Sequence, residues 1–411
     1  MSTSEQPAPL YGEDYYRDPY PLFSSLREQG TVHPVAFPAI DAWLVTGYDA
    51  AHAALGDDRL GKNHARANAR WHAKASIMPE PQHSRLQVHL LHQDPPRHTA
   101  MRAMIADHFT ARRSEAHRAG IRAHVHALID DLPVGSVDFI EGFAGRLPFL
   151  ALRDAIGLPD NLAQQFDPAW GGVVAPVGPD DPRRPHYEGL LRGLEGYIAD
   201  VVAHFTGGSG DQSVLLARLV REHEHGDLTS NELSSIIFQL LAAGQDPVTN
   251  QLGMAILTLL RHPDAHAWLV AHPDGIDRAT EELLRYESAF GQTTWRFFTE
   301  DTEFGDHTVP AGDSVIISLM AANRDPAKFR CPAELDLQRT PNPHLAFGHG
   351  VHFCPGAHLA RIQIQETLTA ITARITDLRL DCEETDLEFL HAPLARGVTK
   401  LPIRYSAVKP A

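Results

Sequence analysis

The sequence predicts a mainly α-helical protein with a minor β part. A capping box, Thr229-Ser-Asn-Glu232, opens an apolar run that continues to about Leu260, an arrangement typical of a helix start. A second helical pattern covers residues 99–132, whereas strand-like stretches are few and short. Neither an internal repeat nor a low-complexity linker divides the chain. These observations favour a mostly helical fold, while the length of 411 residues alone would allow two or three domains.

In the first half of the chain, residues 41–50 begin as a short strand around Trp43-Leu-Val-Thr and continue into a helix at residues 48–55. Residues 60–90 are polar, rich in histidine and weakly patterned, so we expect a long, partly irregular loop. Within residues 99–132, apolar side chains recur at helical spacing on one stripe, formed by Ile121, Val125, Leu128, Ile129 and Leu132.

In the second half, residues 170–185 are dense in glycine and proline and are expected to form a surface loop between helices. The helix that starts near Thr229 would be far longer than an average helix. Further helices are expected at residues 276–287 and 356–377. A hairpin of short strands is expected at residues 302–318, and short strands and turns at 378–405.

The bulk composition excludes several classes of protein. With 43% hydrophobic and 21% charged residues among 411, the chain has the composition of a globular protein. No run approaches the roughly 18 apolar residues of a membrane span, and the polar start lacks the pattern of a secretory signal. We therefore expect a cytoplasmic enzyme without a membrane partner. The net charge of −16, from 36 basic and 52 acidic residues, argues against nucleic acid as a partner.

The cysteines and histidines do not form an obvious metal cluster in sequence. Cys331, Cys354 and Cys382 make neither a disulfide framework nor a Cys-x-x-Cys site, which favours a reducing compartment. The 25 histidines are scattered. The run His223-Glu224-His225 has no matching ligands nearby in sequence and is interpreted as a solvated loop.

The stretch Phe347-Gly-His-Gly-Val-His-Phe-Cys354-Pro-Gly-Ala-His-Leu-Ala-Arg361 places one cysteine between a glycine-rich turn and a helix. Gly348 and Gly350 permit a tight turn. Cys354 is expected at the N-cap with Pro355 as the first helical residue, where the helix dipole favours a thiolate, a strong iron ligand. A lone buried cysteine is usually an inert small hydrophobe, but the residues around this one argue against that alternative.

This stretch resembles the haem-ligand loop of the cytochrome P-450 family, whose pattern Phe-Gly-x-Gly-x-His-x-Cys-x-Gly is present at every fixed position. The resemblance runs from about Asp18 to Tyr405. It implies a cytochrome P-450 fold in a single haem domain at residues 18–405, with tails at 1–17 and 406–411. It also implies haem b (iron protoporphyrin IX) held between the long oxygen-activation helix and the cysteine-loop helix. Cys354 would be the metal ligand and dioxygen the co-substrate.

The same resemblance assigns the residues that would hold the haem. His98 and Arg102 lie at i and i+4 on a helix, where both can project toward one anion, and in the family this is a haem propionate. Arg296 and His352 match two more propionate contacts. Phe347 would pack on the porphyrin near the sulfur, and the Gly356 amide would donate to the sulfur. Taken alone, each charged residue among them would be read as a surface charge.

A charge network is expected beneath the haem loop. Glu282-Leu-Leu-Arg285 matches the family's Glu-x-x-Arg helix, and Arg339 matches the third member of the set. Glu282 and Arg285 share a helix face at i and i+3. The resemblance gives these three residues a buried structural role, and the alternative is an exposed ion pair of little energetic value.

The oxygen-activation helix departs from the family pattern. It reads Ala243-Gly-Gln-Asp-Pro-Val-Thr-Asn250, so Gly244, Asp246 and Pro247 occupy the catalytic positions and proline replaces the usual threonine. Proline has no hydroxyl to relay a proton, and it favours a kink. Thr249 would face away, two residues farther around the helix. Either the proline is simply tolerated, or water, Asp246 or a polar substrate group completes the relay.

Pro355 is a second departure, because it removes one backbone amide that could donate to the sulfur. Fewer donors would leave more electron density on the thiolate and lower the iron potential. The alternative is that Pro355 simply begins the helix well.

The substrate pocket is expected to combine parts of residues 60–92, the 165–190 region, the oxygen-activation helix and residues 290–295 and 390–394. Its lining would be apolar with several polar anchors, which suits a mid-sized secondary metabolite of aromatic or peptide-derived origin. Hydroxylation and oxidative coupling are both open. The expected substrate contacts are Ala243, Phe290, Gln292, Thr293, Thr294, Trp295 and Leu394.

The resemblance thus implies a haem-thiolate monooxygenase or oxidase that acts on a small molecule. Because the chain ends soon after the haem domain, we expect electrons from a separate ferredoxin and its reductase. A basic patch for the acidic ferredoxin could be supplied by Arg97, Arg102, Arg112, Arg113 and Arg118.

Two other functions stay open. One is a peroxide-driven peroxygenase, whose branch of the family has Arg-Pro where this chain has Asp246-Pro247. The other is a non-catalytic haem sensor or recruitment domain. The intact Cys354, Asp246 and propionate set argue against this second alternative.

Overall fold

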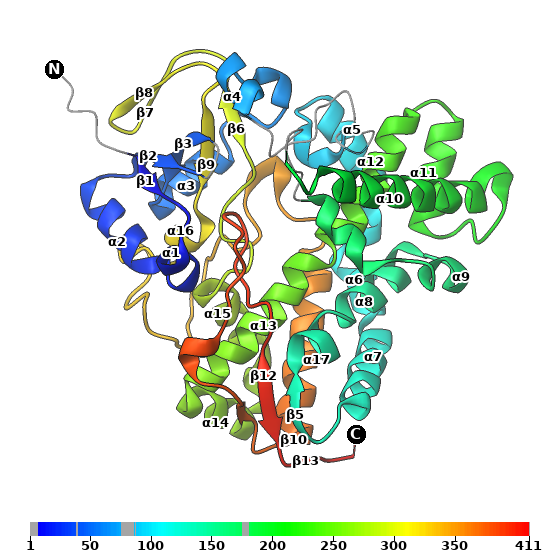
Figure 1. Cartoon of the computed structure of the whole chain (residues 1–411), viewed down its shortest axis with the longest axis vertical. Helices are drawn as coiled ribbons and strands as arrows, with labels where there is room; N and C mark the ends of the chain where they lie inside the picture. The colour runs from blue at the N-terminus through cyan, green and yellow to red at the C-terminus, as the bar shows by residue number, and fades with distance from the viewer. Residues whose placement is uncertain (1–6, 38–39, 75–85, 87, 175–180, 411) are drawn as a thin grey trace.

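The computed structural model describes residues 7–37, 40–74, 86, 88–174 and 181–410. They form a mostly helical fold in which α13 and α17 run through the middle of the molecule (Figure 1). The expected fold class is confirmed. The helices are α1 Glu13–Arg17, α2 Tyr20–Gln29, α3 Tyr48–Leu55, α4 Ala69–Lys74, α5 Arg97–Ala106, α6 Ala111–Ala116, α7 Arg118–Asp131, α8 Leu147–Ile156, α9 Asp160–Ala163, α10 Arg184–Phe205, α11 Leu215–Glu224, α12 Ser230–Ala243, α13 Asp246–Arg261, α14 Pro263–Ala271, α15 Ile276–Tyr286, α16 Leu319–Asn323 and α17 Ala357–Arg374.

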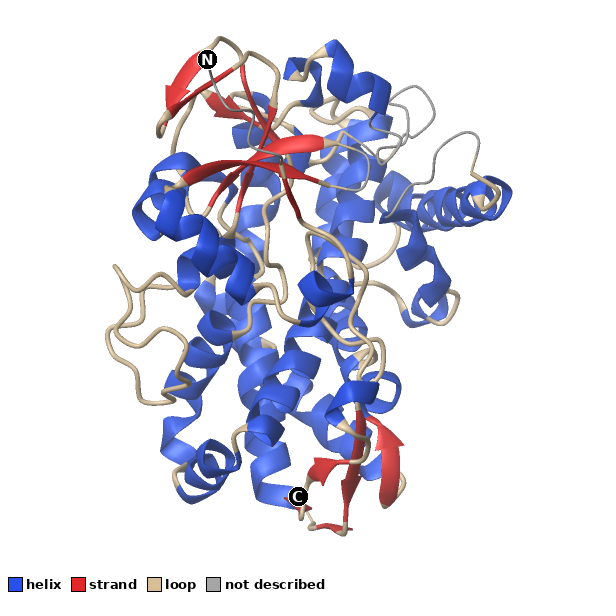
Figure 2. Cartoon of the chain, turned by 60° about the vertical axis from the view of Figure 1, so that its left-hand side comes forward, coloured by secondary structure: helices blue, strands red, loops and turns tan. Residues whose placement is uncertain are grey.

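Small sheets lie at opposite ends of the molecule (Figure 2). The larger sheet has the strand order β1-β2-β3-β9-β6-β4, in which β1–β2 and β3–β9 are parallel pairs. Near the C-terminus, β12 pairs antiparallel with β11 and β5, and β10 pairs with β13. The strands are β1 Ala8–Pro9, β2 Val32–Ala36, β3 Asp41–Val45, β4 Leu60–Gly61, β5 Gly135–Asp138, β6 Arg296–Phe298, β7 Thr302–Phe304, β8 His307–Val309, β9 Ser314–Ile317, β10 Ile375–Thr376, β11 Arg379–Leu380, β12 Pro402–Tyr405 and β13 Ala407–Val408.

The main apolar core joins the helices, and smaller clusters lie on the two faces of the larger sheet. The apolar stripe expected in residues 99–132 is buried as predicted, with Val125 and Ile129 at 0% exposure. The stretch is not one helix, however: α5, α6 and α7 follow one another with changes of direction. Thr110 caps α6 by accepting a hydrogen bond from the Arg113 amide, which favours a new helix start there.

The long helix expected from Thr229 to Leu260 is split in two. Its capping box is present, with the Thr229 side chain accepting from the Glu232 amide. The helix then breaks at Gly244 and Gln245 and restarts at Asp246, with Pro247 in the first turn of α13. Proline is favoured in a first turn because its missing N–H has no intrahelical partner there. Gly244 also packs tightly on Leu152 of α8, where a Cβ would lie 2.9 Å from that side chain.

Several expected loops contain regular structure. In residues 60–90 the described part forms β4, the 3-10 helix His64–Arg66 and α4, while 75–85 and 87 lie outside the described residues. Residues 170–185 begin within the 3-10 helix Pro168–Val174 and end within the first turn of α10. Residues 175–180 between them also lie outside the described residues. The predicted hairpin at 302–318 is limited to β7–β8, because β9 leaves it to pair with β3 and β6.

Both expected tails contribute to the fold. β1 pairs with β2, and the neighbouring Leu10 is completely buried. β13 pairs with β10 beyond residue 405. The packed part of the chain therefore extends past the boundaries at 18 and 405, because strand pairing satisfies backbone groups that local sequence patterns do not reveal. Among the described residues, no helix combines the length and apolarity required to span a membrane.

Candidate active site

Two glycines shape the loop that carries Cys354. Gly348 and Gly350 both have φ of 73°, in the left-handed region, and a Cβ on Gly350 would lie 2.7 Å from the Leu55 carbonyl oxygen. The Cys354 amide donates to the Phe347 carbonyl over 3.0 Å and closes the loop. The N-cap of α17 is Gly356, not Cys354. The expected N-cap position is therefore wrong by two residues, because Pro355 and Gly356 form a turn before the helix begins.

The sulfur of Cys354 has both desolvating and stabilising neighbours. Burial raises the pKa of the thiol, whereas the Gly356 backbone N–H and the positive charges of Arg102 and Arg361 lower it. The free thiol thus stays protonated, and a bound metal would favour the thiolate directly. Pro355 occupies a turn position that proline favours, which supports the structural interpretation of that residue.

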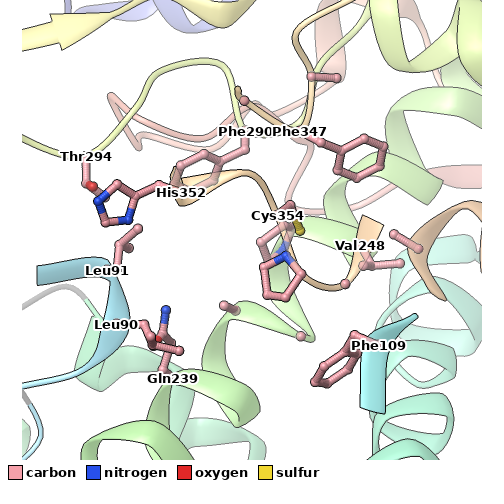
Figure 3. A pocket seen from close by; sticks show the side chains of 18 of the residues that line it. Leu90, Leu91, Phe109, Gln239, Val248, Phe290, Thr294, Phe347, His352 and Cys354 are labelled. Carbon is pink, nitrogen blue, oxygen red and sulfur yellow. The ribbon is translucent and has the colours of Figure 1, made fainter. Parts of the chain in front are cut away.

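Cys354 lies on the wall of a cavity between α5, α12, α13 and α17 (Figure 3). Phe347 and Val248 also line it, and Gln239 projects into it from α12. Most of the wall is apolar, with Ile105, Leu240, Ala243, Leu284, Ala289, Leu359 and Ile364 among its members. Such a space accepts a large apolar group next to the sulfur.

One side of this cavity gathers basic side chains, namely Lys62, His98, Arg102, Arg296 and His352. The rings of His98 and His352 are 4.2 Å apart between centroids. Burial, followed by the charges of Lys62 and Arg296, lowers the pKa of His352. Arg296 is 3% exposed, and its Nε has no hydrogen-bond partner in the part of the chain that the structure describes. This concentration of buried donors fits an anion that enters the cavity.

Haem combines an iron atom, two flat apolar faces and two carboxylates on one edge. The cavity offers a thiol, apolar walls and a cluster of cations on one side. The orphaned Arg296 Nε and His98 Nδ1 are the buried groups that such carboxylates would satisfy. The residues present therefore fit haem.

Known proteins share this arrangement of the chain. The family model described as Cytochrome P450 matches residues 276–389. Cytochrome P450 monooxygenase PikC of Streptomyces venezuelae is 36% identical over 400 residues, which cover 96% of this chain and 92% of that protein. This chain belongs to the cytochrome P450 family. It is accordingly an oxidoreductase of the monooxygenase class.

Other relatives of this P450 match along nearly the whole chain. The 6-deoxyerythronolide B hydroxylase of Saccharopolyspora erythraea is 33% identical over 401 residues, covering 96% of this chain and 98% of that one. Among solved structures, CxnD, a P450 for C–S bond formation in chuangxinmycin biosynthesis, has a TM-score of 0.89 at 29% identity and full coverage of both chains. Tirandamycin C-bound TamI has a TM-score of 0.86 at 31% identity, covering 97% of this chain and 100% of that one. The fold of this P450 is that of its family.

The oxygen-activation segment of this P450 is only partly directed at the cavity. Gly244 and Pro247 line it. Asp246 does not: its carboxylate lies beside the 3-10 helix Pro168–Val174, 3.8 Å from where a Cβ on Gly171 would be. Although Asp246 keeps solvent exposure, desolvation by the surrounding protein raises its pKa. Thr249 is not among the lining residues either, in line with the expected direction of its side chain.

The expected substrate contacts divide into two groups. Ala243, Phe290, Thr293 and Thr294 line the cavity. Gln292, Trp295 and Leu394 do not line the cavity, because each of them contacts other parts of the fold. Gln292 is fully buried and donates to the Tyr15 hydroxyl. Trp295 packs edge-on against Phe37 and Trp71, and the Leu394 carbonyl accepts from the amides of Gly291 and Gln292.

Lys62, Leu90 and Leu91 line the cavity from the expected segment 60–92, although none of them was singled out, whereas Phe109 and Gln239 were not expected at all. Gln239 lies one helical turn before Ala243, so its helical spacing was a usable signal. Its Oε1 is buried without a partner among the described residues. Lys62 gave no signal beyond being a single lysine after a strand-like pair.

The charge network expected beneath the cysteine loop is present. Arg285 donates to both Glu282 oxygens over 2.7 and 2.8 Å, and Arg339 Nε lies 3.0 and 3.1 Å from the same carboxylate. Glu282 and Arg285 are completely buried. Arg285 also donates to the carbonyls of Asn323 and Pro332, so the network joins α15 to the segment that leads to Cys354.

The proposed basic patch for a ferredoxin is smaller than expected. Arg97 is paired with Glu232, and Arg118 with Glu115 and Glu366. Arg102 faces the cavity. Arg112 and Arg113 are exposed. Sequence proximity had grouped side chains that tertiary contacts separate.

Three histidine rings, those of His64, His89 and His92, contact one another in tilted arrangements beside the cavity, and acid is expected to destabilise this region. The rings of His64 and His89 lie 3.9 and 4.2 Å from that of His92. Burial, followed by nearby positive charges, lowers the pKa of both His64 and His89 from 6.5 to about 3. Because the folded state keeps both neutral, their contribution to stability is complete above about pH 6.5. It falls by about 1.4 kcal/mol per pH unit for each histidine as the pH drops toward 3.

Chemical unfolding between about pH 7 and pH 5 checks this expectation. The double variant His64→Gln/His89→Gln should lose less stability on acidification than the wild type. The exposed control His225→Gln should keep the wild-type slope. An unchanged slope in the double variant would contradict the prediction.

Proposed function

We propose that this P450 binds haem b through Cys354 and oxidises a mid-sized natural product with dioxygen, using electrons from a separate ferredoxin and its reductase. The observation that carries the proposal is the joint placement of the Cys354 sulfur and the basic cluster on one cavity. The likeness to P450s of known activity along nearly the whole chain supports it.

The residues of the cavity divide the work of holding haem. Cys354 would bind the iron, with the Gly356 amide donating to its sulfur. Arg102, Arg296, His98 and His352 would bind the carboxylates, and Phe347 would pack on the macrocycle. A haem iron with a thiolate ligand supplies the reductive activation of dioxygen. Arg361, whose guanidinium lies 4.5 Å from the Phe347 ring centroid, would steady that ring.

The substrate side of the cavity is mostly apolar, with Gln239 as a polar group. This lining suits a substrate larger and more functionalised than a plain hydrocarbon. The names of several similar proteins refer to natural products, among them the polyketide biosynthesis P450 PksS of Bacillus subtilis. Because CxnD forms a C–S bond, oxidative coupling is kept beside hydroxylation.

Proton delivery in this P450 has to proceed without a threonine at position 247. Pro247 lines the cavity, whereas the Asp246 carboxylate lies toward Gly171. Water, Asp246 after a change of side-chain direction, or a polar group of the substrate would complete the relay.

Pro247→Thr tests this relay. The variant places a hydroxyl on the cavity wall, and we expect a several-fold change in the ratio of product formed to peroxide released. Reducing-equivalent consumption, product and peroxide are measured together, with a substrate found by spectral binding screens. Thr249→Val, which removes a hydroxyl that does not line the cavity, is the matched control. A ratio unchanged in Pro247→Thr would remove support for substrate-assisted relay.

Turnover under three conditions tests the proposed function. The purified protein is given substrate with ferredoxin, reductase and NADPH, with hydrogen peroxide alone, or with neither. Product only under the first condition supports the proposal, whereas equal or greater turnover with peroxide alone supports the peroxygenase. Binding of a protein partner without turnover under any condition supports a sensor or recruitment role.

A further inference from the structure

Lys62 is a buried cation on the cavity wall for which the family resemblance gives no role. It follows directly after β4 and is 2% exposed. Its Nζ donates to the Thr294 hydroxyl, and Thr294 projects into the cavity (Figure 3). Within the described part of the chain, no carboxylate lies within 4.0 Å of this Nζ. A protonated Lys62 therefore has no direct counterion among the described residues.

The nearest acid, Asp94, is already engaged. Its carboxylate accepts from the backbone N–H of Lys62 over 2.7 Å and forms an ion pair with Arg66 Nε at 2.7 Å. The pair packs against Gly61, where a Cβ would lie 2.6 Å from both the Arg66 and Asp94 side chains. The Asp94 carbonyl accepts from the His98 amide over 3.0 Å. Asp94 thus fixes the Lys62 backbone beside the start of α5.

An ammonium group with one hydroxyl partner is unfavourable inside a protein, since it has three donors and has lost its water. Burial, followed by the charge of Arg296, lowers the pKa of Lys62 well below its usual value. An anion entering the cavity would relieve this penalty. The basic side chains around Lys62 can therefore accommodate a bound anion.

The neighbours of Lys62 indicate which anion that is. Lys62 contributes to lowering the pKa of His98 and His352, and it lies beside Arg296. These are the residues proposed above to bind the haem carboxylates. Arg102 and Arg296 would supply two positive charges to the two carboxylates, and Lys62, which lies beside Arg296, would add a third.

We propose that Lys62 binds a haem carboxylate together with Arg296, and that Thr294 and Asp94 hold it in position. The inference rests on haem as the occupant of the cavity. Its chemistry is a charge-assisted hydrogen bond from the ammonium to a carboxylate oxygen. Removing it should weaken haem retention and disfavour the reduced, less positively charged haem.

The test compares the holoenzyme with Lys62→Met, Thr294→Val and the exposed control Lys400→Met. Haem transfer to excess apomyoglobin measures retention, and spectroelectrochemical titration measures the reduction potential. Lys62→Met should release haem roughly ten- to a hundredfold faster and should have a lower potential. Thr294→Val keeps the cation, so its potential should stay near that of the wild type, with a smaller increase in haem release. Lys400→Met should change neither quantity.

The outcomes separate this inference from the proposed function. A wild-type protein that takes up no haem would overturn the proposed function itself. If the wild type binds haem, but Lys62→Met has the wild-type rate of haem release and the wild-type reduction potential, only the proposed role of Lys62 is overturned. Dodecanoate serves as a carboxylate probe for the alternative that Lys62 binds a substrate anion. If the wild type binds dodecanoate and Lys62→Met does not, with haem release unchanged, the lysine binds a substrate anion and the proposal is overturned. If Lys62→Met does not fold, both measurements are made on Lys62→Gln, which keeps a hydrogen-bond donor to Thr294.

Discussion

Replacing Cys354 with alanine is expected to abolish the monooxygenase activity of this P450, with a fall in turnover of more than about a hundredfold. Loss of an outer-shell partner alone typically weakens metal affinity or activity by 10–100-fold, and this change removes the metal ligand itself. Cys354 is the cysteine that lines the cavity, whereas Cys331 is exposed. No other sulfur of the described residues can take its place at that wall.

The carbon monoxide spectrum of the reduced protein and the haem content per chain check this result. Cys354→Ala should lose the thiolate-type Soret band and hold less haem. Cys382→Ser is the control, because Cys382 lies among acidic residues outside the cavity and its loss should leave spectrum and turnover unchanged. A thiolate-type band in Cys354→Ala would show that the ligand has been assigned to the wrong residue.

Glu282→Gln is expected to lower the free energy of unfolding by about 3–5 kcal/mol, because it removes the charge that neutralises two arginines in a buried network. The glutamine keeps the shape of the side chain, so the loss reports charge more than packing. Glu282 also accepts from the Asp336 amide and from Asn342, at 2.9 and 3.1 Å. The segment between α16 and the cysteine loop is held by these contacts.

Denaturant unfolding, followed both by far-UV circular dichroism and by the Soret band, measures this effect. The matched control is Glu115→Gln. Glu115 has a side chain that is 57% exposed and pairs with Arg118, so its loss should change stability by no more than about 0.5 kcal/mol. If Glu282→Gln cost no more than this control, the network would not be a main support of the fold.

Local patterns were sufficient for the parts of the site that lie close together in sequence. The glycines before Cys354 require a tight loop because their φ values are positive. Glu282 and Arg285 share a face because they are three residues apart on a helix. The capping box at Thr229 was recognisable for the same reason, since its bonds close within one turn.

Packing between distant elements explains the wrong expectations. Gln292 and Trp295 were grouped with Thr293 and Thr294, but the N-terminal helix and α4 provide partners that turn them away from the cavity. Asp246 follows a helix break whose geometry depends on the close contact of Gly244 with α8. Local spacing predicts the face of a continuous helix and cannot predict how a broken one restarts.

The sequence by itself determined the family, the thiol that would bind iron and most of the cations around it, because each is encoded in a short motif with fixed spacing. Only the tertiary structure decided that Lys62 joins those cations. Lys62 directly follows β4, whose partner strand β6 begins with Arg296, and Asp94 ties the start of α5 to the same place. Positive charges from three separate segments lie close together because the β4–β6 pairing and the Asp94 carboxylate bring their backbones together. Local sequence periodicity carries no information about such contacts between distant segments.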